Sequence, residues 1–128
     1  MLYLFDIDGT LVDTGGAGMA ALKQATREVF GDEGPELDLA GATDRGIVGS
    51  IHRHYGVEFT DEAFENYLTV YHERLAQNLA RGEFAGRVID GVSPLLRHLE
   101  ADDSSALGLL TGNTAQGAGI KVRYFGLA

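Results

Sequence analysis

The chain has 128 residues, enough for one ordinary domain or for part of a larger one. Ten Lys and Arg against nineteen Asp and Glu give a net charge of −9, which argues against the basic surface that nucleic-acid or anionic-membrane binding requires. No apolar stretch is long enough to span a membrane, and the absence of cysteine excludes disulfides and thiolate metal sites. We therefore expect a cytoplasmic protein that binds neither nucleic acid nor membrane. The sequence does not indicate an oligomeric state.

Two short apolar runs predict buried, parallel strands. Residues 2–7 lack apolar/polar alternation and lead into a turn at Asp8-Gly9, and residues 106–110 lead into Thr111-Gly112-Asn113. Most of the chain between the two runs has a helical pattern. The sequence therefore predicts a parallel pair of strands that are far apart along the chain.

Five helices are predicted from apolar spacing and capping residues. The first spans 17–30, with Leu22, Ala25 and Val29 on one face, and the second runs through Tyr55 and is capped by Thr43 or Asp44. The third runs to Arg81, with Thr60 as N-cap and Gly82 after it. A short fourth helix runs through Leu99 with Ser93 as N-cap before Pro94, and the last is capped by Thr114 and ended by Gly126. The third carries a continuous apolar stripe of Phe64, Leu68, Tyr71, Leu75 and Leu79.

This order of elements indicates an α/β fold with an insertion. About seventy mostly helical residues separate the two predicted strands, and glycine-rich joints bracket them. We expect a parallel-sheet core made of residues 1–14 and 86–128, and an inserted helical domain made of residues 15–85.

The sharpest chemical feature is Asp6-Ile7-Asp8-Gly9-Thr10, directly after the first strand. Ligands of open α/β sheets bind at the carboxyl ends of the strands. Two carboxylates so close together need a cation or a shared proton between them. Mg²⁺, a hard ion with oxygen ligands, is the first candidate. The alternative is a turn in which Asp8-Gly9 only bends the chain.

The second feature is Thr111-Gly112-Asn113-Thr114, which again joins a strand to a helix. A hydroxyl, a glycine amide and a helix N-terminus together can hold a phosphate group. Helix capping alone also explains the motif when it stands by itself. Its pairing with Asp-x-Asp at the end of another strand favours phosphate binding.

The motifs DIDGTLVDT, from Asp6 to Thr14, and LLTGNT, from Leu109 to Thr114, resemble those of the haloacid-dehalogenase-like (HAD) superfamily, in its phosphatase branch. The two motifs are most similar to those of the phosphoglycolate-phosphatase-like group. The resemblance implies a Rossmann-like core and a helical cap at the position of the insertion. It also implies a Mg²⁺-dependent phosphatase that hydrolyses a small phosphorylated metabolite, a phosphoglycolate-like phosphomonoester, through an aspartyl-phosphate.

The resemblance assigns roles to the core residues. Asp6 resembles the nucleophile and Asp8 the general acid/base, with the Asp6 carboxylate and the Asp8 carbonyl as Mg²⁺ ligands. Thr111, Gly112 and Asn113 resemble the phosphate-binding turn.

Two cationic residues are assigned less directly. A lysine is expected near the nucleophile, and Lys121 is the downstream candidate; the alternative is a solvated lysine beside Arg123. Arg45, in the segment 41–45 that resembles a substrate-selecting part of the cap, either meets an anionic substrate tail or belongs to a surface capping turn. His72 and His98 are isolated in the sequence and are expected at the surface or its boundary.

Two other functions remain open at this point. One is a receiver-type phospho-signalling domain, although receivers carry adjacent rather than alternate acids. The other is a truncated or degenerate fragment without activity, because the superfamily pattern continues with further strands and an acidic motif after the point where this sequence stops. On that interpretation, the chain alone is expected to be neither a competent phosphatase nor a robust monomer.

Overall fold

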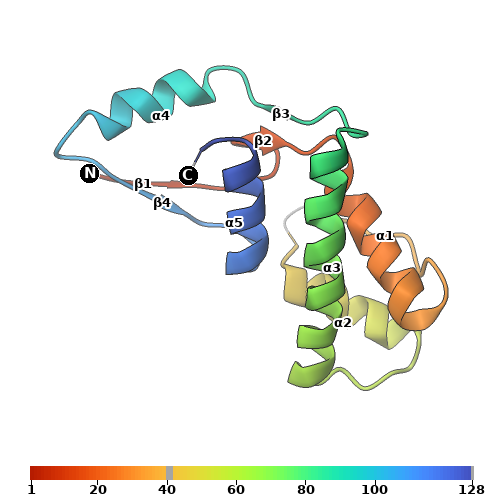
Figure 1. Ribbon diagram of the computed structural model, residues 1–128. Coiled ribbons are helices and arrows are strands. Elements are labelled where there is room, and N and C mark those ends of the chain that lie inside the picture. The colour runs from red at the N-terminus through yellow and green to blue at the C-terminus, as the bar shows by residue number, and fades with distance from the viewer. Residues whose placement is uncertain (40–41, 128) are drawn as a thin grey trace.

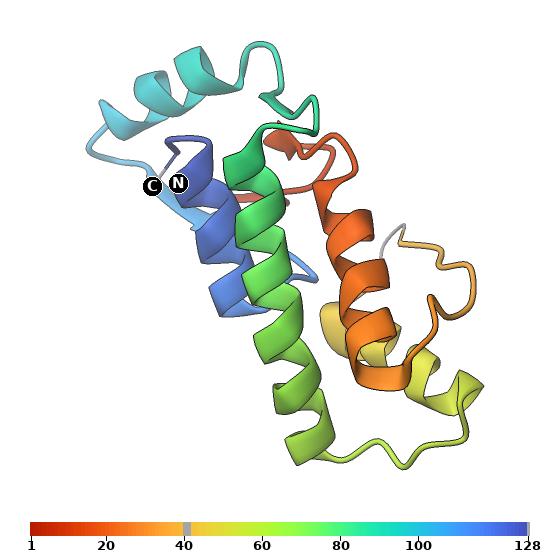
Figure 2. The same ribbon diagram turned by 45° about the vertical axis from the view of Figure 1, so that its right-hand side comes forward.

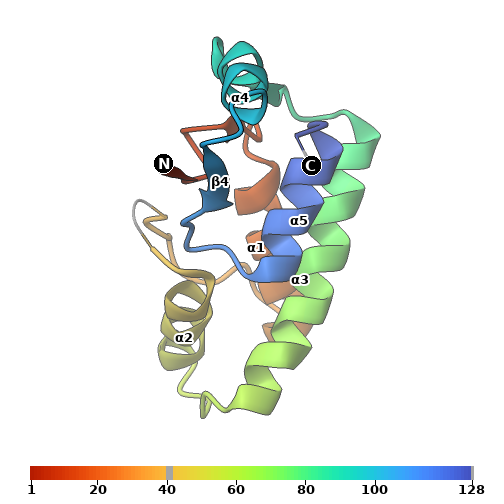
Figure 3. The ribbon, with the colours of Figure 1, turned by 90° about the vertical axis from the view of Figure 1, so that its left-hand side faces the viewer.

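The computed structural model describes residues 1–39 and 42–127. Its elements in chain order are β1 (Leu2–Phe5), β2 (Val12–Asp13), α1 (Ala17–Phe30), α2 (Asp44–His54), α3 (Asp61–Arg81), β3 (Arg87–Val88), α4 (Val92–Glu100), β4 (Ala106–Leu109) and α5 (Ala115–Tyr124). Figures 1 and 2 show α1, α2 and α3 gathered in one region, the cap, and β1, β4 and α4 in a second, the core. Helix α5 follows β4 and packs against α3, so it joins the two regions (Figure 3).

The two predicted strands pair in parallel, as expected. β1 and β4 align in register from Leu2 opposite Ala106 to Phe5 opposite Leu109. β1 ends before Ile7 because the chain turns there: the Ile7 carbonyl accepts hydrogen bonds from the backbone N–H groups of Leu11 and Val12. The fold is therefore α/β, with a short parallel sheet.

The expectation that both strands are buried is wrong for the described residues. Leu4 is 52% exposed and Leu109 is 45% exposed. The sheet formed by β1 and β4 has two strands, and the described helices leave part of its apolar surface accessible. The apolar runs encode strands correctly, while their burial depends on what packs against them.

A second, antiparallel pair was not predicted. β2 and β3 are two residues long, with Val12 opposite Val88 and Asp13 opposite Arg87, too short for any periodicity in the sequence. This ribbon joins the two chain segments that pass between core and cap. The expected boundaries at 14/15 and 85/86 fall beside it, and the division into two domains stays a prediction.

Glycine is required where these two segments cross. Gly15 has φ +66°, and a Cβ built there would lie 2.7 Å from the Ala85 carbonyl carbon. That is closer than a real Cβ approaches another atom, so a side chain at Gly15 would force the two segments apart.

The cap is held by one apolar cluster shared by its three helices. The predicted stripe on α3 is buried, with Leu75 fully inaccessible, and Thr60 caps the helix by accepting a hydrogen bond from the Ala63 N–H. Truncating a side chain such as Leu75 to Ala typically costs about 2–5 kcal/mol. The cap therefore has a well-packed core of its own.

Three details of the helices differ from the sequence predictions or resolve them. On α1, Val29 is 43% exposed, and Thr26 is buried in its place because its hydroxyl bonds to the Leu22 carbonyl and to Tyr67. Helix α2 is capped by Thr43, whose side chain accepts from the Gly46 N–H. Helix α4 begins one residue before Ser93, with Gly91 as N-cap at φ +85°.

The last helix begins where the sequence predicts. Thr114 is its N-cap and accepts a hydrogen bond from the Gly117 N–H at 3.1 Å. No helix within residues 1–39 and 42–127 combines the length and the apolar character that a membrane crossing requires.

Candidate active site

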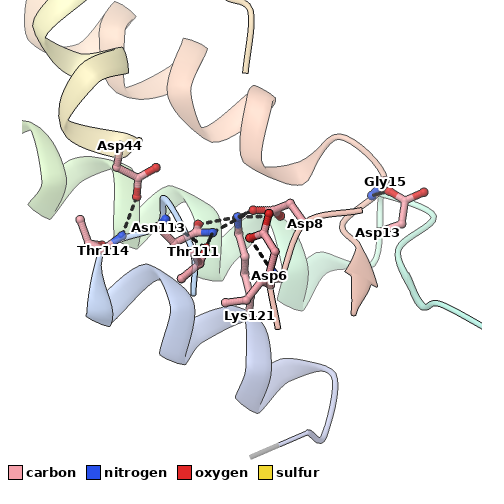
Figure 4. Close-up of polar contacts among 10 residues, drawn as sticks. Asp6, Asp8, Asp13, Gly15, Asp44, Thr111, Asn113, Thr114 and Lys121 are labelled. Carbon is pink, nitrogen blue, oxygen red and sulfur yellow. Dashed lines mark hydrogen bonds and ion pairs between the residues drawn. The ribbon is translucent and has the colours of Figure 1, made fainter. Parts of the chain in front are cut away.

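Asp6 and Asp8 follow β1 and line a cleft of about 420 Å³ between core and cap. Between them, Ile7 is fully buried and anchors the turn. One Asp6 oxygen accepts a hydrogen bond from the Ile7 N–H at 2.8 Å, and its second oxygen has no partner among the described residues. The sequence motif thus places two carboxylates at the mouth of one cleft (Figure 4).

The turn after β4 lies beside these carboxylates because the two strands are parallel and in register. The Leu110 N–H donates to the Phe5 carbonyl at 2.9 Å and continues the pairing to the end of β1. Beyond it, the Asn113 amide donates to Asp8 Oδ2 at 2.9 Å and to the Thr111 hydroxyl at 2.8 Å. The two predicted motifs therefore meet.

Lys121 reaches into the cleft rather than into solvent. Its Nζ lies 2.9 Å from each oxygen of Asp8 and 2.8 Å from Asn113 Oδ1, and the residue is 4% exposed. Helical side chains lean toward the N-terminus, which lets the Lys121 side chain reach back toward the turn before α5. Of the two alternatives for Lys121, the structure places it at the site; its catalytic role stays a prediction.

The oxygen atoms present fit part of a Mg²⁺ coordination shell. The free oxygen of Asp6 and the Asp8 carbonyl are hard donors, and the carbonyl accepts no hydrogen bond from the described residues because the Asp8–Val12 bridge uses its neighbours' groups. The Asp8 carboxylate is already bound by Lys121 and Asn113. Within residues 1–39 and 42–127, no three His, Cys, Asp or Glu residues form a metal-binding group. Mg²⁺ commonly keeps several waters and uses one or two carboxylates.

The cap contributes an acid that sequence reasoning used only as a possible cap. Asp44 begins α2, is 8% exposed and lines the cleft. Its Oδ2 accepts from the Thr114 N–H at 3.0 Å, and its own N–H donates to the Gly112 carbonyl at 2.8 Å. Burial raises the pKa of Asp44, and the Thr114 N–H and the charge of Lys121 partly offset that rise.

His72 makes a second link between cap and core. Its Nε2 lies 2.9 Å from the Thr114 hydroxyl oxygen. At 5% exposure His72 is buried, so the expectation that it lies at the surface or its boundary is wrong. Burial lowers the pKa of His72 more than the Asp44 and Glu65 carboxylates raise it. The sequence held a usable signal: His72 stands four residues after Leu68 and three before Leu75, at the edge of the apolar stripe.

The turn that precedes α5 also touches the cap through its glycine. A Cβ built at Gly112 would lie 2.4 Å from the Ala42 carbonyl oxygen. Only glycine fits between this turn and the cap segment at this distance.

Arg45 is not brought to the cleft. It pairs with Asp61, and its guanidinium carbon lies 5.0 Å from the ring centroid of Phe64 and 5.5 Å from that of Phe59. In the segment expected to select substrate, Gly41 lies outside the described residues, and Ala42 and Asp44 line the cleft. The surface alternative for Arg45 therefore agrees with the structure.

The family model for haloacid dehalogenase-like hydrolases matches residues 3–128, and the chain belongs to this family. No curated protein sequence matches this chain. Several solved structures share its fold, and the chain spans little more than half of each.

Three of these structures show the range of relatives. A hydrolase from Pseudomonas syringae is 21% identical with a TM-score of 0.69, over 98% of this chain and 56% of that one. CbbY from Rhodobacter sphaeroides, in complex with phosphate, is 18% identical with a TM-score of 0.71, over 96% and 56%. A predicted phosphoglycolate phosphatase from Haemophilus somnus 129PT is 19% identical with a TM-score of 0.62, over 99% and 57%. At these identities, the likeness establishes the fold alone.

Proposed function

We propose that this chain carries the nucleophile and the acid/base of a Mg²⁺-dependent phosphatase that acts on a small phosphorylated metabolite. The observation that carries the proposal is the pairing of two differently held carboxylates. Asp6 keeps one oxygen free of hydrogen bonds, whereas Asp8 is held by Lys121 and Asn113. One carboxylate is available to attack, and its neighbour is fixed in place for proton transfer.

The reaction divides into two displacements. In the first, an Asp6 oxygen bonds to phosphorus as the bond to the ester oxygen breaks, and protonated Asp8 gives its proton to the departing alcohol. In the second, Asp8 takes a proton from water, the water oxygen bonds to phosphorus, and the bond to Asp6 breaks to release phosphate. Each turnover returns both carboxyl groups to their starting forms.

Other groups of the site serve the phosphate. The Thr111 hydroxyl and the Gly112 N–H stand at the start of the turn that leads into α5, where a helix N-terminus favours anions. The Asp6 carboxylate and the Asp8 carbonyl would hold Mg²⁺, which would supply positive charge for the phosphate. The charge of Lys121 holds the acid/base carboxylate in position.

The comparisons support the hydrolase class more than any particular substrate. Membership of the family supports a hydrolase, and solved structures that are named as phosphatases share the fold. A receiver domain would not carry about seventy helical residues between the strand bearing its acids and the next one, so that alternative has no support here.

The test is Asp6→Asn in the encoded protein, with phosphate release measured from an aryl phosphate in Mg²⁺. The change is nearly isosteric, so we expect an intact fold and a loss of more than about a thousandfold, the scale on which nucleophile removal acts. Asp103→Asn, in an exposed turn, is the matched control and should keep wild-type activity. Activity of Asp6→Asn within tenfold of wild type would exclude Asp6 as the nucleophile, and full activity after chelation would exclude the metal.

A further inference from the structure

The cap wall of the cleft is mainly apolar. Its charged member among the described residues is one carboxylate, Asp44, on helix α2. The apolar side chains around it come from α1, α2, α3 and the segment before α2, and they are Met19, Leu22, Leu39, Ala42 and Ile47, with the ring of Tyr71.

Among the described residues that line the cleft, no cation remains for a second anionic group of a substrate. Lys121 is the lining lysine, and its ammonium group already contacts both oxygens of Asp8 and Asn113 Oδ1. Arg45 is held by Asp61 outside the cleft. With the phosphate itself bound at the core wall, an anionic leaving group would face the Asp44 carboxylate without a counter-charge.

Tyr71 adds a buried polar group with no partner. The residue is 2% exposed and lines the cleft, and its hydroxyl makes no hydrogen bond to any described residue. The same is true of the second oxygen of Asp44, because only Oδ2 accepts from Thr114. No side-chain oxygen or nitrogen of the described residues is both fully buried and unpartnered, so both atoms reach solvent, and the cleft is the space that their residues line.

We propose that the leaving group of the substrate is uncharged and bears a hydroxyl, which Tyr71 and Asp44 bind, and that the site disfavours anionic leaving groups such as glycolate. A hydroxyl both donates and accepts, so it can donate to the Asp44 oxygen and accept from the Tyr71 hydroxyl. A carboxylate can only accept, and Asp44 repels it. This inference rests on the proposed phosphatase function and replaces the phosphoglycolate-like substrate expected from the resemblance.

The size of the cleft limits the substrate to a small molecule. At about 420 Å³, the cleft is near the lower end of ligand pockets, which run from about 300 to 1,000 Å³. Part of that space belongs to the phosphate. The remaining volume and the apolar wall fit a short polyol or sugar chain whose carbon atoms contact the cap.

The direct test compares three phosphate esters of similar size in the encoded protein: 2-hydroxyethyl phosphate, propyl phosphate and phosphoglycolate. We expect kcat/KM to be highest for 2-hydroxyethyl phosphate and at least about tenfold lower for phosphoglycolate, the effect of one or two hydrogen bonds together with charge repulsion. A wild-type preference for phosphoglycolate would overturn the proposal.

Two variants test which residues select the leaving group. Tyr71→Phe should reduce the preference for 2-hydroxyethyl over propyl phosphate by about three- to tenfold, the loss of one neutral hydrogen bond. Asp44→Asn keeps an acceptor for the Thr114 N–H and removes the charge. It should therefore raise kcat/KM for phosphoglycolate relative to kcat/KM for the other two esters. Tyr55→Phe, whose hydroxyl bonds to Asp32 at the far end of the cap, is the control and should keep the wild-type ratios. Unaltered ratios in both cleft variants would overturn the assignment.

A binding experiment separates this inference from the catalytic proposal. Calorimetry with 3-hydroxypropylphosphonate and 3-phosphonopropionate measures selection without turnover. Tighter binding of the hydroxyl compound by a protein that hydrolyses no phosphate ester would support the cleft's selectivity and count against the phosphatase. Equal binding, or tighter binding of the carboxylate compound, would overturn the selectivity even in an active enzyme.

Discussion

The two walls of the cleft are built from different kinds of sequence. The core wall takes most of its groups from two short motifs, each directly after a strand, and hydrogen bonds join the Asp8 carboxylate, the Asn113 amide and the Lys121 ammonium group. The cap wall takes its groups from separate helices, is largely apolar, and leaves the Tyr71 hydroxyl and one Asp44 oxygen without partners. A connected polar network keeps reacting groups in fixed positions, whereas unpartnered polar atoms on an apolar wall are available to a ligand.

The difference predicts that changes to the core wall alter the rate for every substrate, whereas changes to the cap wall alter which substrate is preferred. The junction between the walls, where Gly112 meets Ala42 and Thr114 meets Asp44 and His72, should affect stability first. Variants of the core wall, the cap wall and the junction can each contradict this assignment of effects.

The largest effect after loss of the nucleophile is expected for Asp8→Ala. If Asp8 protonates the leaving group, kcat should fall by about 10²–10⁴-fold, the usual contribution of general acid catalysis. The loss should be smaller for an aryl phosphate, whose leaving group needs no proton, than for an alkyl phosphate. Steady-state kinetics on the two esters make the comparison, and equal losses would remove Asp8 from the acid role.

Lys121→Met should follow, with a loss of about 10²–10³-fold in kcat/KM, the scale for removal of one preorganised charge. The variant keeps a long apolar side chain at a buried position and removes the ammonium group between Asp8 and Asn113. Lys23→Met, on the exposed face of α1, is the control. If the two lysine variants behave alike in the kinetic assay, Lys121 has no part in the chemistry.

At the junction, Gly112→Ala should destabilise the protein by about 1–3 kcal/mol, as overpacking typically does. Its new Cβ would lie 2.4 Å from the Ala42 carbonyl oxygen, so the cap segment must move. Gly119→Ala meets only the flexible end of Arg123 and should be neutral or stabilising by up to about 1 kcal/mol. Urea denaturation measures the unfolding free energies of both variants. Equal stabilities would show that the cap segment can move away from the turn at little cost.

Most of the core wall could be predicted from the sequence because its geometry is local. Asp6 and Asp8 stand two residues apart after a strand, and parallel pairing brings the turn at Thr111 to the same end of the sheet. Lys121 was harder to assign because it stands seven residues after Thr114, and the spacing along the helix does not show which way its long side chain extends. The burial of β1 and β4 was predicted wrongly because the sequence of a strand does not show which other elements pack against it.

The cap wall was less predictable because it depends on the rotation of each helix. Asp44 and Arg45 are neighbours at the start of α2, and adjacent helical residues point about 100° apart. The sequence alone does not say which of them faces the core, and it left both alternatives for Arg45 open. Tyr71 was placed correctly in the apolar stripe of α3, but the spacing of that stripe does not show that the residue lines the cleft.

The smallest effect concerns His72, whose Nε2 contacts the Thr114 hydroxyl at the start of α5. Burial lowers the pKa of His72 in the folded protein, whereas an unfolded chain has the ordinary value of about 6.5. Above that value both states hold the histidine neutral, and its contribution to stability is fully present. As the pH falls below about 6.5, the unfolded state takes up the proton first, so the free energy of unfolding declines until the folded-state pKa is reached.

His72→Gln should reduce that decline, because glutamine can still bond to the Thr114 hydroxyl and does not titrate. The measurement is the difference in unfolding free energy between pH 7.5 and pH 5.5, compared among wild type, His72→Gln and His98→Gln. The last removes a histidine from the exposed side of α4 that makes no contact with Thr114, so it controls for the loss of a histidine alone. A decline in His72→Gln as steep as in wild type would mean that the bond between His72 and Thr114 does not couple the cap to the core as the pH changes. A shallower decline, with little change in substrate preference, would place His72 at the junction and leave selection to Tyr71 and Asp44.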